Sequence, residues 1–442
     1  MPNLAMAESL RDAVRSALTS NPEVKAASAE MRASAFELLR LRSEYQPVVT
    51  AFGALGAQHF NTDSSSLVSD GRKTVFSREI GVEAEIVLFD GQRRANLVYA
   101  NAARVDANVF RLLDASETMA LNATEVYIDA MRLVRLRDAA SRNVRRHQAI
   151  LTRVIDLVEG GRLPLSDQLQ AQDRLTAAQL ALVEVSRSAR DADARYERII
   201  GKPRQGELNV PPLHNLPSDR VSLIRAAVDN SYRVRIANIE VDRAAYERRV
   251  VESDRKPRIS FNAGVTRGLD VDRTAEADTD AFVGVRMSWI LHQGGRRAQS
   301  RAADERRHKA ISERNVAIRE VRELAESSWN SYTANQERSR ILARQLRANN
   351  ELVTQFESEF DAGTRSLLDV LEIERARFEV RFEKISADAG LAFSAYRLLA
   401  AQSKLADNFG AAPANTVLTP DFESRALQKP TSVFQTEIEP LR

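Results

Sequence analysis

The sequence predicts a mainly α-helical protein with a small β part, built from one unit that occurs twice. Three observations predict this fold: two long stretches without glycine or proline, turns that recur at a nearly constant spacing, and short segments of alternating polarity. The composition agrees, because 28% charged residues with only 6% aromatic residues is typical of long helices with solvated faces.

The two long stretches predict unusually long helices. No glycine or proline occurs from Gln92 to Glu159 or from Arg296 to Ala362. Both stretches are rich in alanine, leucine, arginine and glutamate, which favour helix. As single helices they would each reach on the order of 100 Å. We expect long helices at about 92–159 and 296–362, each followed by a second helix at about 166–200 and 367–404.

Two different turns recur between the halves of the chain. Gly91 and Gly294 lie 203 residues apart in similar turns before the long stretches, and Gly161 and Gly363 lie 202 residues apart in similar turns after them. Such agreement indicates internal duplication. We therefore expect a first repeat at 8–210, a second repeat at 211–409 and a C-terminal tail at 410–442. Each repeat would begin with a pair of shorter helices, at about 9–45 and 221–254.

Each repeat also carries a predicted β-hairpin, at about 47–89 and 257–292. Apolar residues alternate there with polar ones, so that Glu83, Glu85 and Arg286 fall on a polar face. Strands of about ten residues can cross a bilayer when tilted. Four strands cannot close a membrane barrel, since open edges leave backbone groups unpaired in lipid, but three copies would supply twelve strands. We expect the three polar residues to line the lumen of such a barrel, and the alternative is that they form the solvated face of a sheet.

Several classes of function are excluded or disfavoured. The 64 basic and 61 acidic residues are interspersed, so no basic block indicates nucleic-acid binding. The chain has no cysteine, and its five histidines are scattered without metal-ligand spacing. No phosphate-binding loop or catalytic triad is evident, so we expect neither an enzyme nor a cofactor or metal site. No apolar run is long enough for a transmembrane helix. An A-x-A pattern at Ala5–Ala7 is similar to a signal-peptidase site, so the chain could be a mature form.

The order and spacing of these motifs resemble those of one family. The segments Phe89–Arg94, Gln293–Arg297 and Ala362–Leu371 resemble the TolC-like outer-membrane efflux proteins, and the similarity extends over about residues 8–409. The resemblance implies a homotrimer with a twelve-stranded β-barrel in the outer membrane of a Gram-negative bacterium, contacting lipid. Beneath it would lie a twelve-helix α-barrel extending into the periplasm, with a belt of shorter helices at mid-height. The tail after Phe409 would lie along this belt or be mobile.

The same resemblance implies a function and partners. The chain would be the passive exit duct of a tripartite efflux or type I secretion system, joined to a periplasmic adaptor protein and an inner-membrane transporter. Its gate would lie at the periplasmic helix tips and consist of Ser166, Asp167, Asp369 and Glu372. A ring of carboxylates around a three-fold axis binds cations. The alternative role of Asp167 and Asp369 is to stabilise the first turn of a helix, and both roles can coexist. The position of the family's locking arginine is occupied by Asp388.

The tip turns would dock the adaptor. The resemblance assigns this role to Gly161, Arg162 and Leu163 in the first repeat, and to Gly363, Thr364 and Arg365 in the second. The alternative is that the glycines only end the helices, although this would not explain an exposed Leu163 and the two arginines.

An alternative from another class is a soluble coiled-coil scaffold or tethering protein. It would explain the long helices but not the paired hairpins or the repeat. Drug efflux, metal efflux and protein secretion are not distinguished by this sequence.

Overall fold

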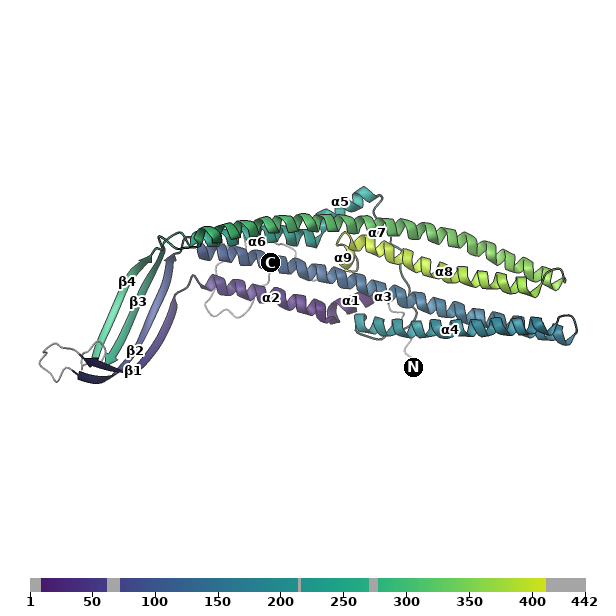
Figure 1. Ribbon diagram of the computed structural model, residues 1–442, viewed down its shortest axis with the longest axis horizontal. Coiled ribbons are helices and arrows are strands. Elements are labelled where there is room, and N and C mark those ends of the chain that lie inside the picture. The colour runs from purple at the N-terminus through teal and green to yellow at the C-terminus, as the bar shows by residue number, and fades with distance from the viewer. Residues whose placement is uncertain (1–8, 62–71, 214–215, 270–276, 411–442) are drawn as a thin grey trace. The chain divides into compact units, whose positions relative to one another are not determined.

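The computed structural model describes residues 9–61, 72–213, 216–269 and 277–410 (Figure 1). Ala5–Ala7, His214 and the tail beyond Gly410 lie outside these residues. The elements of the first half are α1 (Leu10–Ser20), α2 (Pro22–Ser43), β1 (Val48–Asn61), β2 (Arg72–Phe89), α3 (Arg93–Glu159) and α4 (Leu165–Ile200). Those of the second half are α5 (Arg220–Asn230), α6 (Tyr232–Ser253), β3 (Arg258–Leu269), β4 (Ala277–Ser288), α7 (Arg296–Asp361), α8 (Leu367–Ala400) and α9 (Leu405–Asn408).

Helix ends follow local sequence signals. Pro22 begins α2 at a position where its missing N–H is not needed, which separates α1 from α2. Gly201 ends α4 in the left-handed conformation, with φ of 84°. In contrast to the predicted helix at 367–404, α8 ends at Ala400. The reason is a chain reversal at Ser403, which has a φ of 54° and precedes the short helix α9.

The two halves match element by element. Helices α1 and α5 have 11 residues each, and α2 and α6 have 22 residues each. The starts of both pairs lie 210 residues apart (220 − 10 and 232 − 22).

The chain forms two compact units, and each of them draws residues from both halves of the sequence. In its described part the first unit contains α1, α3 from Val109, α4, α5, α7 from Asn315, α8 and α9. Tyr127, Tyr196 and Tyr396 are among its largest fully buried side chains. The Tyr127 and Tyr396 hydroxyls donate to the carbonyls of Asn209 and Pro211 at 3.1 and 3.0 Å, and so anchor the connection between the halves.

The second unit contains a four-stranded antiparallel sheet in the order β1-β2-β3-β4 (Figure 1). The unit also includes α2 from Glu30, the first part of α3, α6 from Ala237 and the first part of α7. Tyr99 of α3 stacks on Tyr246 of α6, with ring centroids 5.0 Å apart. A small core joins α2 to α3 and consists of Leu38, Leu41, Val98, Ala102 and Val105.

One face of this sheet is apolar and exposed. Val82 lies opposite Val265, and Val285 lies opposite Phe261, so their side chains share this face. Val82, Val265 and Val285 are each more than half exposed. A contiguous apolar surface of this kind marks a site of contact with protein or lipid. Among the described residues, no helix is both long and apolar enough to cross a membrane.

Candidate functional site

The candidate site is the pair of tip turns in the first unit, between α3 and α4 and between α7 and α8. Gly161 and Gly363 adopt left-handed backbone conformations, with φ of 68° and 76°. After them, the N–H groups of Arg162 and Thr364 donate to carbonyls five residues back, at 2.8 and 2.9 Å. Both turns therefore satisfy helix C-terminal carbonyls in the same way.

Leu163 differs from the expectation that it is exposed. It is half-buried and packs on a tip core that α3, α4 and α8 form together. This core consists of Ile150, Leu151, Val154, Ala171, Leu175, Leu367 and Leu371. Because Leu163 buries apolar surface against this core, its side chain stabilises the turn. The exposed apolar residues at this tip are instead Leu165 and Leu169 of α4.

Arg365 organises the second tip. Its guanidinium pairs with Glu359 at 2.7 Å and lies 4.1 Å from the centroid of the Phe356 ring. The same group lies 3.8 Å from Asp369, at the edge of an ion-pair distance. The hydrogen bond from Gln355, and then the one from Arg365, lower the pKa of the Glu359 carboxyl. Arg365 therefore ties the end of α7 to the start of α8.

Asp369 takes part in capping α8. The Ser366 hydroxyl accepts the Asp369 N–H at 3.2 Å and donates to the Asp369 carboxylate at 2.8 Å. A carboxylate in the first turn also offsets the helix macrodipole. At the first tip, Pro164 is the N-cap and provides no side-chain bond, and the Ser166 hydroxyl lies 3.5 Å from the Asp167 carboxylate.

Glu372 links α8 to α4. Its carboxylate binds Arg174 of α4 at 2.9 Å and Arg375 of its own helix at 2.7 Å. The hydrogen bond from Arg375 lowers the pKa of the Glu372 carboxyl, with further contributions from the charges of Arg375 and Arg174. The sequence analysis missed both arginines, although the i, i+3 spacing of Glu372 and Arg375 is a helical pairing signal.

An ion-pair network around the buried carboxylate of Glu374 lies about two turns into α8. The Glu374 side chain is 1% exposed and binds Arg146 of α3 at 2.6 Å and Arg377 at 2.5 Å. Arg146 also pairs with Glu357 of α7. Burial lowers the pKa of the adjacent His147. Since Arg146 contacts both α7 and α8, this network joins the two helical hairpins of the unit.

Asp388 does not join these tip contacts in the structure. Its carboxylate accepts the Ser339 hydroxyl of α7 at 2.8 Å and pairs with Lys384 on its own helix.

The predicted polar sheet residues share one face of the second unit. Glu83 lies opposite Gly264, and Glu85 lies opposite Asn262 and forms a 3.4 Å ion pair with Arg258. Arg286 lies opposite Ser260. These residues lie on the side of the sheet opposite the exposed valines.

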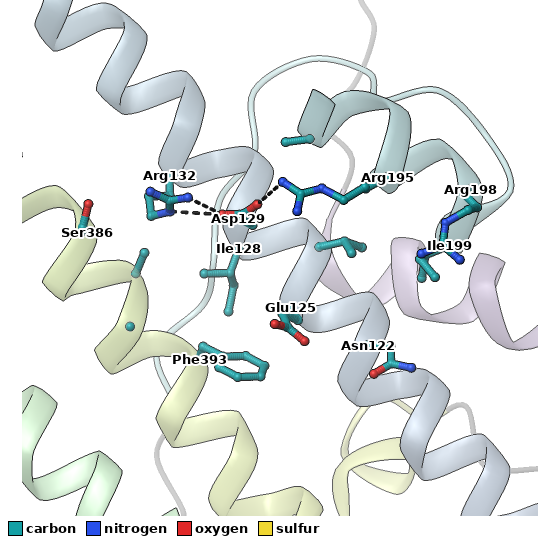
Figure 2. Close-up of a pocket in the computed structure, with 14 residues that line it drawn as sticks. Asn122, Glu125, Ile128, Asp129, Arg132, Arg195, Arg198, Ile199, Ser386 and Phe393 are labelled. Atoms are coloured by element: carbon teal, nitrogen blue, oxygen red, sulfur yellow. Dashed lines mark hydrogen bonds and ion pairs between the residues drawn. The ribbon is translucent and has the colours of Figure 1, made fainter. Parts of the chain in front are cut away.

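The first unit also contains a cavity of about 740 Å³ lined by α3, α4 and α8 (Figure 2). Asp129 of α3 lies between Arg132 at 2.6 Å and Arg195 of α4 at 3.2 Å. Phe393 and Ile128 contribute apolar lining (Figure 2). Sequence analysis gave no indication of this cavity. Across the described residues, no group of three acidic or histidine side chains is arranged to hold a metal ion.

Comparison with known proteins gives a consistent result. A model of the outer membrane efflux protein family matches residues 13–202 and again residues 223–402. The outer membrane efflux protein BepC of Brucella suis biovar 1 (strain 1330) is 24% identical over 417 residues, covering 92% of this chain and 88% of BepC. The alkaline protease secretion protein AprF of Pseudomonas aeruginosa is 26% identical over 308 residues, covering 64% of this chain and 63% of AprF.

Solved structures share the fold. The open-state structure of the MtrE outer membrane channel of Neisseria gonorrhoeae has a TM-score of 0.75 and 16% identity, covering 89% of this chain and 88% of MtrE. VceC, an outer membrane protein of Vibrio cholerae, has a TM-score of 0.74 and 14% identity, covering 91% and 96%.

Because the family model matches well over half of the chain, in both halves, the resemblance noted from the motifs is confirmed. The chain belongs to the outer membrane efflux protein family and lies in the outer membrane of a Gram-negative bacterium, extending into the periplasm.

Proposed function

We propose that the chain works as a homotrimer that forms the exit duct of a tripartite efflux or type I secretion system. Three copies would join their sheets into a twelve-stranded barrel and their long helices into a twelve-helix tunnel. The observation that carries this proposal is the sheet, whose two edges β1 and β4 are unpaired within the described chain and whose one face is apolar and exposed. Unpaired edges in lipid are costly, so closure with further copies satisfies them.

The polar face of the sheet supports a lumen role for Glu83, Glu85 and Arg286. In a closed barrel one face meets lipid and the other lines the interior, and the apolar face carries the exposed valines. The three charged residues then line the interior.

The duct would be gated at the helix tips. Around a three-fold axis, Ser166, Asp167, Asp369 and Glu372 of each copy would form rings that attract cations and disfavour anions. The ion pair between Glu372 and Arg174 would keep α8 against α4 in the closed state. Opening would then require this pair to break.

The turn residues would dock a periplasmic adaptor protein. Gly161, Arg162 and Leu163 form one docking turn, and Gly363, Thr364 and Arg365 form the other. Exposed Leu165 and Leu368 beside these turns support the assignment, because exposed apolar residues at a tip suit a protein contact.

Members of the family are channels rather than enzymes, and we propose the same of this chain. An inner-membrane transporter would supply the energy, and no cofactor would be required. The names of the relatives refer to efflux for BepC and to alkaline protease secretion for AprF, which supports a role in efflux or in secretion. A soluble coiled-coil scaffold is less well supported, since it leaves the exposed apolar face of the sheet unexplained.

The test is the mass of the protein purified from detergent-extracted outer membranes. Light scattering, corrected for bound detergent, should give three times the 49.3 kDa of one chain. Extraction into the aqueous phase without detergent as a 49.3 kDa monomer would contradict the proposal.

A further inference from the structure

The second unit contains two copies of one junction between helices and strands. The first copy joins α2 to β1 and β2 to α3, and the second joins α6 to β3 and β4 to α7. In the hairpins, Val48 pairs with Glu85 and Arg258 pairs with Ser288. The offsets are therefore 210 residues on one strand (258 − 48) and 203 on the other (288 − 85), so each backbone position in one junction has an equivalent in the other.

The turn of the first junction is enclosed on its α2 side. The Arg94 guanidinium pairs with Asp90 at 2.8 Å and donates to the carbonyl of Glu44 at 3.0 Å. It also lies 4.5 Å from the centroid of the Tyr45 ring. The chain residues just after α2 therefore hold this arginine in a buried position.

The same turn is enclosed on its α6 side. Arg93 pairs with Asp254 at 3.4 Å. A Cβ atom added to Gly91 would lie 2.6 Å from the Lys256 Cβ and 2.9 Å from the Ser253 carbonyl oxygen. The residues after α6 thus press directly on the turn, and only glycine fits there.

Among the described residues, the turn of the second junction has only one of these two neighbours. Trp289 donates from its indole Nε1 to the Arg255 carbonyl at 3.0 Å, which provides the α6 side. On the other side a Cβ added to Gly294, the equivalent of Gly91, would meet no described atom within 4 Å. A cavity of about 830 Å³ lies along residues 289–298.

The guanidinium group of Arg296, just after this turn, is also incompletely hydrogen-bonded. Arg296 is equivalent to Arg93 (296 − 203), and its Nη1 donates to the Ile290 carbonyl at 2.8 Å. Its Nε and Nη2 are buried without a hydrogen-bond partner among the described residues. Buried donors of a charged group are costly when unpaired, so the described part of the chain lacks an acceptor for Arg296.

The duplication identifies the missing acceptor. Asp254, which pairs with Arg93, is equivalent to Glu44 (254 − 210), and both follow helices of 22 residues. Glu44 of the same chain cannot serve, because it flanks the first turn. We propose that Glu44 of a second copy of this chain binds Arg296, where β1 of this copy meets β4 in the proposed twelve-stranded barrel. The inference rests on the proposed homotrimer and assigns its subunit contact.

The register between β4 and β1 of the second copy follows from the pairing of β2 with β3, because β4 is equivalent to β2 and β1 is equivalent to β3. Ala84 pairs with Ala263, and Glu83 pairs with Gly264. Adding 203 to the β2 residues and subtracting 210 from the β3 residues gives Met287 opposite Gly53 and Arg286 opposite Ala54 of the second copy. Met287 and its β1 partner then continue the apolar face, while Arg286 remains on the polar face.

The absence of cysteine allows a direct test by engineered disulfides. One variant carries Met287→Cys with Gly53→Cys, and a second carries Arg286→Cys with Ala54→Cys. Opposed residues of antiparallel strands have Cα atoms about 4.5–5.5 Å apart, within disulfide range. Two neighbouring pairs are needed because hydrogen-bonded and non-hydrogen-bonded pairs alternate. The control is Met287→Cys with Ala57→Cys, where the Cα atoms would lie about 13 Å apart.

After oxidation in the membrane, we expect at least one of the two predicted pairs to give covalent trimers on denaturing gels, sensitive to reductant, and the control to remain monomeric. Trimer mass in detergent together with no cross-link in either predicted pair, or with an equal cross-link in the control, would overturn this interface while leaving the proposed function intact. A monomer mass would overturn both.

The ion pair is tested separately by charge exchange. Arg296→Glu and Glu44→Arg should each increase the fraction of monomer in detergent, and the double exchange should restore the trimer, since only directly interacting residues compensate in this way. Double exchange that is as defective as the single variants would contradict the pairing.

Discussion

The two helix tips of the first unit have similar turns but differ in what their second helices bury. Leu367 and Leu371 of α8 are 3% and 0% exposed, whereas the equivalent Leu165 and Leu169 of α4 are 62% and 63% exposed. Both pairs lie 202 residues apart, the same spacing as Gly161 and Gly363. The α8 leucines complete the tip core, while the α4 leucines remain available to another molecule.

The second helices of the two tips also differ in their charged residues. Glu372 and Glu374 of α8 form ion pairs with α4 and α3, and their equivalents in α4 are the neutral Gln170 and Gln172. A duplicated sequence has therefore acquired one tip, here called the tied tip, whose second helix α8 supplies the carboxylates of these ion pairs, and one whose second helix α4 does not. The tied tip is the better candidate for a gate, because it has contacts that can be broken.

The largest effect that would sharpen this comparison comes from Glu374→Ala. It would remove the buried carboxylate that Arg146 and Arg377 share, and losing hydrogen bonds to a charged group costs about 1.5–3 kcal/mol. The thermal unfolding midpoint in detergent should fall clearly. Gln172→Ala, at the equivalent exposed position, should change stability by no more than about 0.5 kcal/mol. Equal effects of the two substitutions would remove the distinction between the tips.

A smaller difference is expected between the two tip arginines. Arg365→Ala would lose the ion pair with Glu359 and the contact with the Phe356 ring, together worth about 1–2 kcal/mol. Arg162 has no ion pair or side-chain hydrogen bond within the described part of the chain, so Arg162→Ala should be nearly neutral. Hydrogen exchange of the tip amides measures the local stability of both variants. Faster exchange in Arg162→Ala than in Arg365→Ala would refute the role given to Arg365.

The caps provide the next comparison. Ser366→Ala removes the bond to the Asp369 N–H and should cost about 1 kcal/mol, a typical value for an N-cap. Ser166 lies inside α4, whose N-cap Pro164 makes no side-chain bond, so Ser166→Ala should have little effect. The thermal unfolding midpoints of the two variants measure this difference. A larger loss of stability in Ser166→Ala than in Ser366→Ala would contradict these cap assignments.

The smallest effect is a dependence on pH at Glu372. Because its pKa is lowered in the folded state, Glu372 contributes stability above the ordinary value of 4.5, and this contribution is lost as the pH falls through the lowered pKa. The pair is partly exposed, so the effect should be below about 1 kcal/mol. The difference in unfolding midpoint between the wild type and Glu372→Gln should be constant above pH 4.5 and vanish in stronger acid. A difference that grows on acidification would have the wrong sign.

The architecture was largely predictable because its signals are local. Absence of glycine and proline predicted helices close to α3 and α7, and alternation in three segments predicted the two hairpins. The break at Ser403 was missed, since its left-handed backbone depends on the contacts that hold α9.

The tip contacts were less predictable, for a physical reason. Local sequence gives equivalent positions in the repeat the same helical environment, but packing buries Glu374 and leaves Gln172 exposed. The pairing of Arg174 with Glu372 joins residues 198 positions apart, which no helical spacing reveals. The roles of the gate and docking residues remain proposals.

The most direct test of the gated duct is single-channel conductance in planar bilayers. The wild type should give a small conductance, and Glu372→Ala and Arg174→Ala should each give a larger one, because either removes the pair that holds α8 against α4. Glu184→Ala is the matched control, since it removes an exposed carboxylate of α4 whose ion pair, within the described residues, is with Arg187 of its own helix, and it should match the wild type. Conductance of the two tip variants equal to that of the wild type and the control would contradict a gate at these tips.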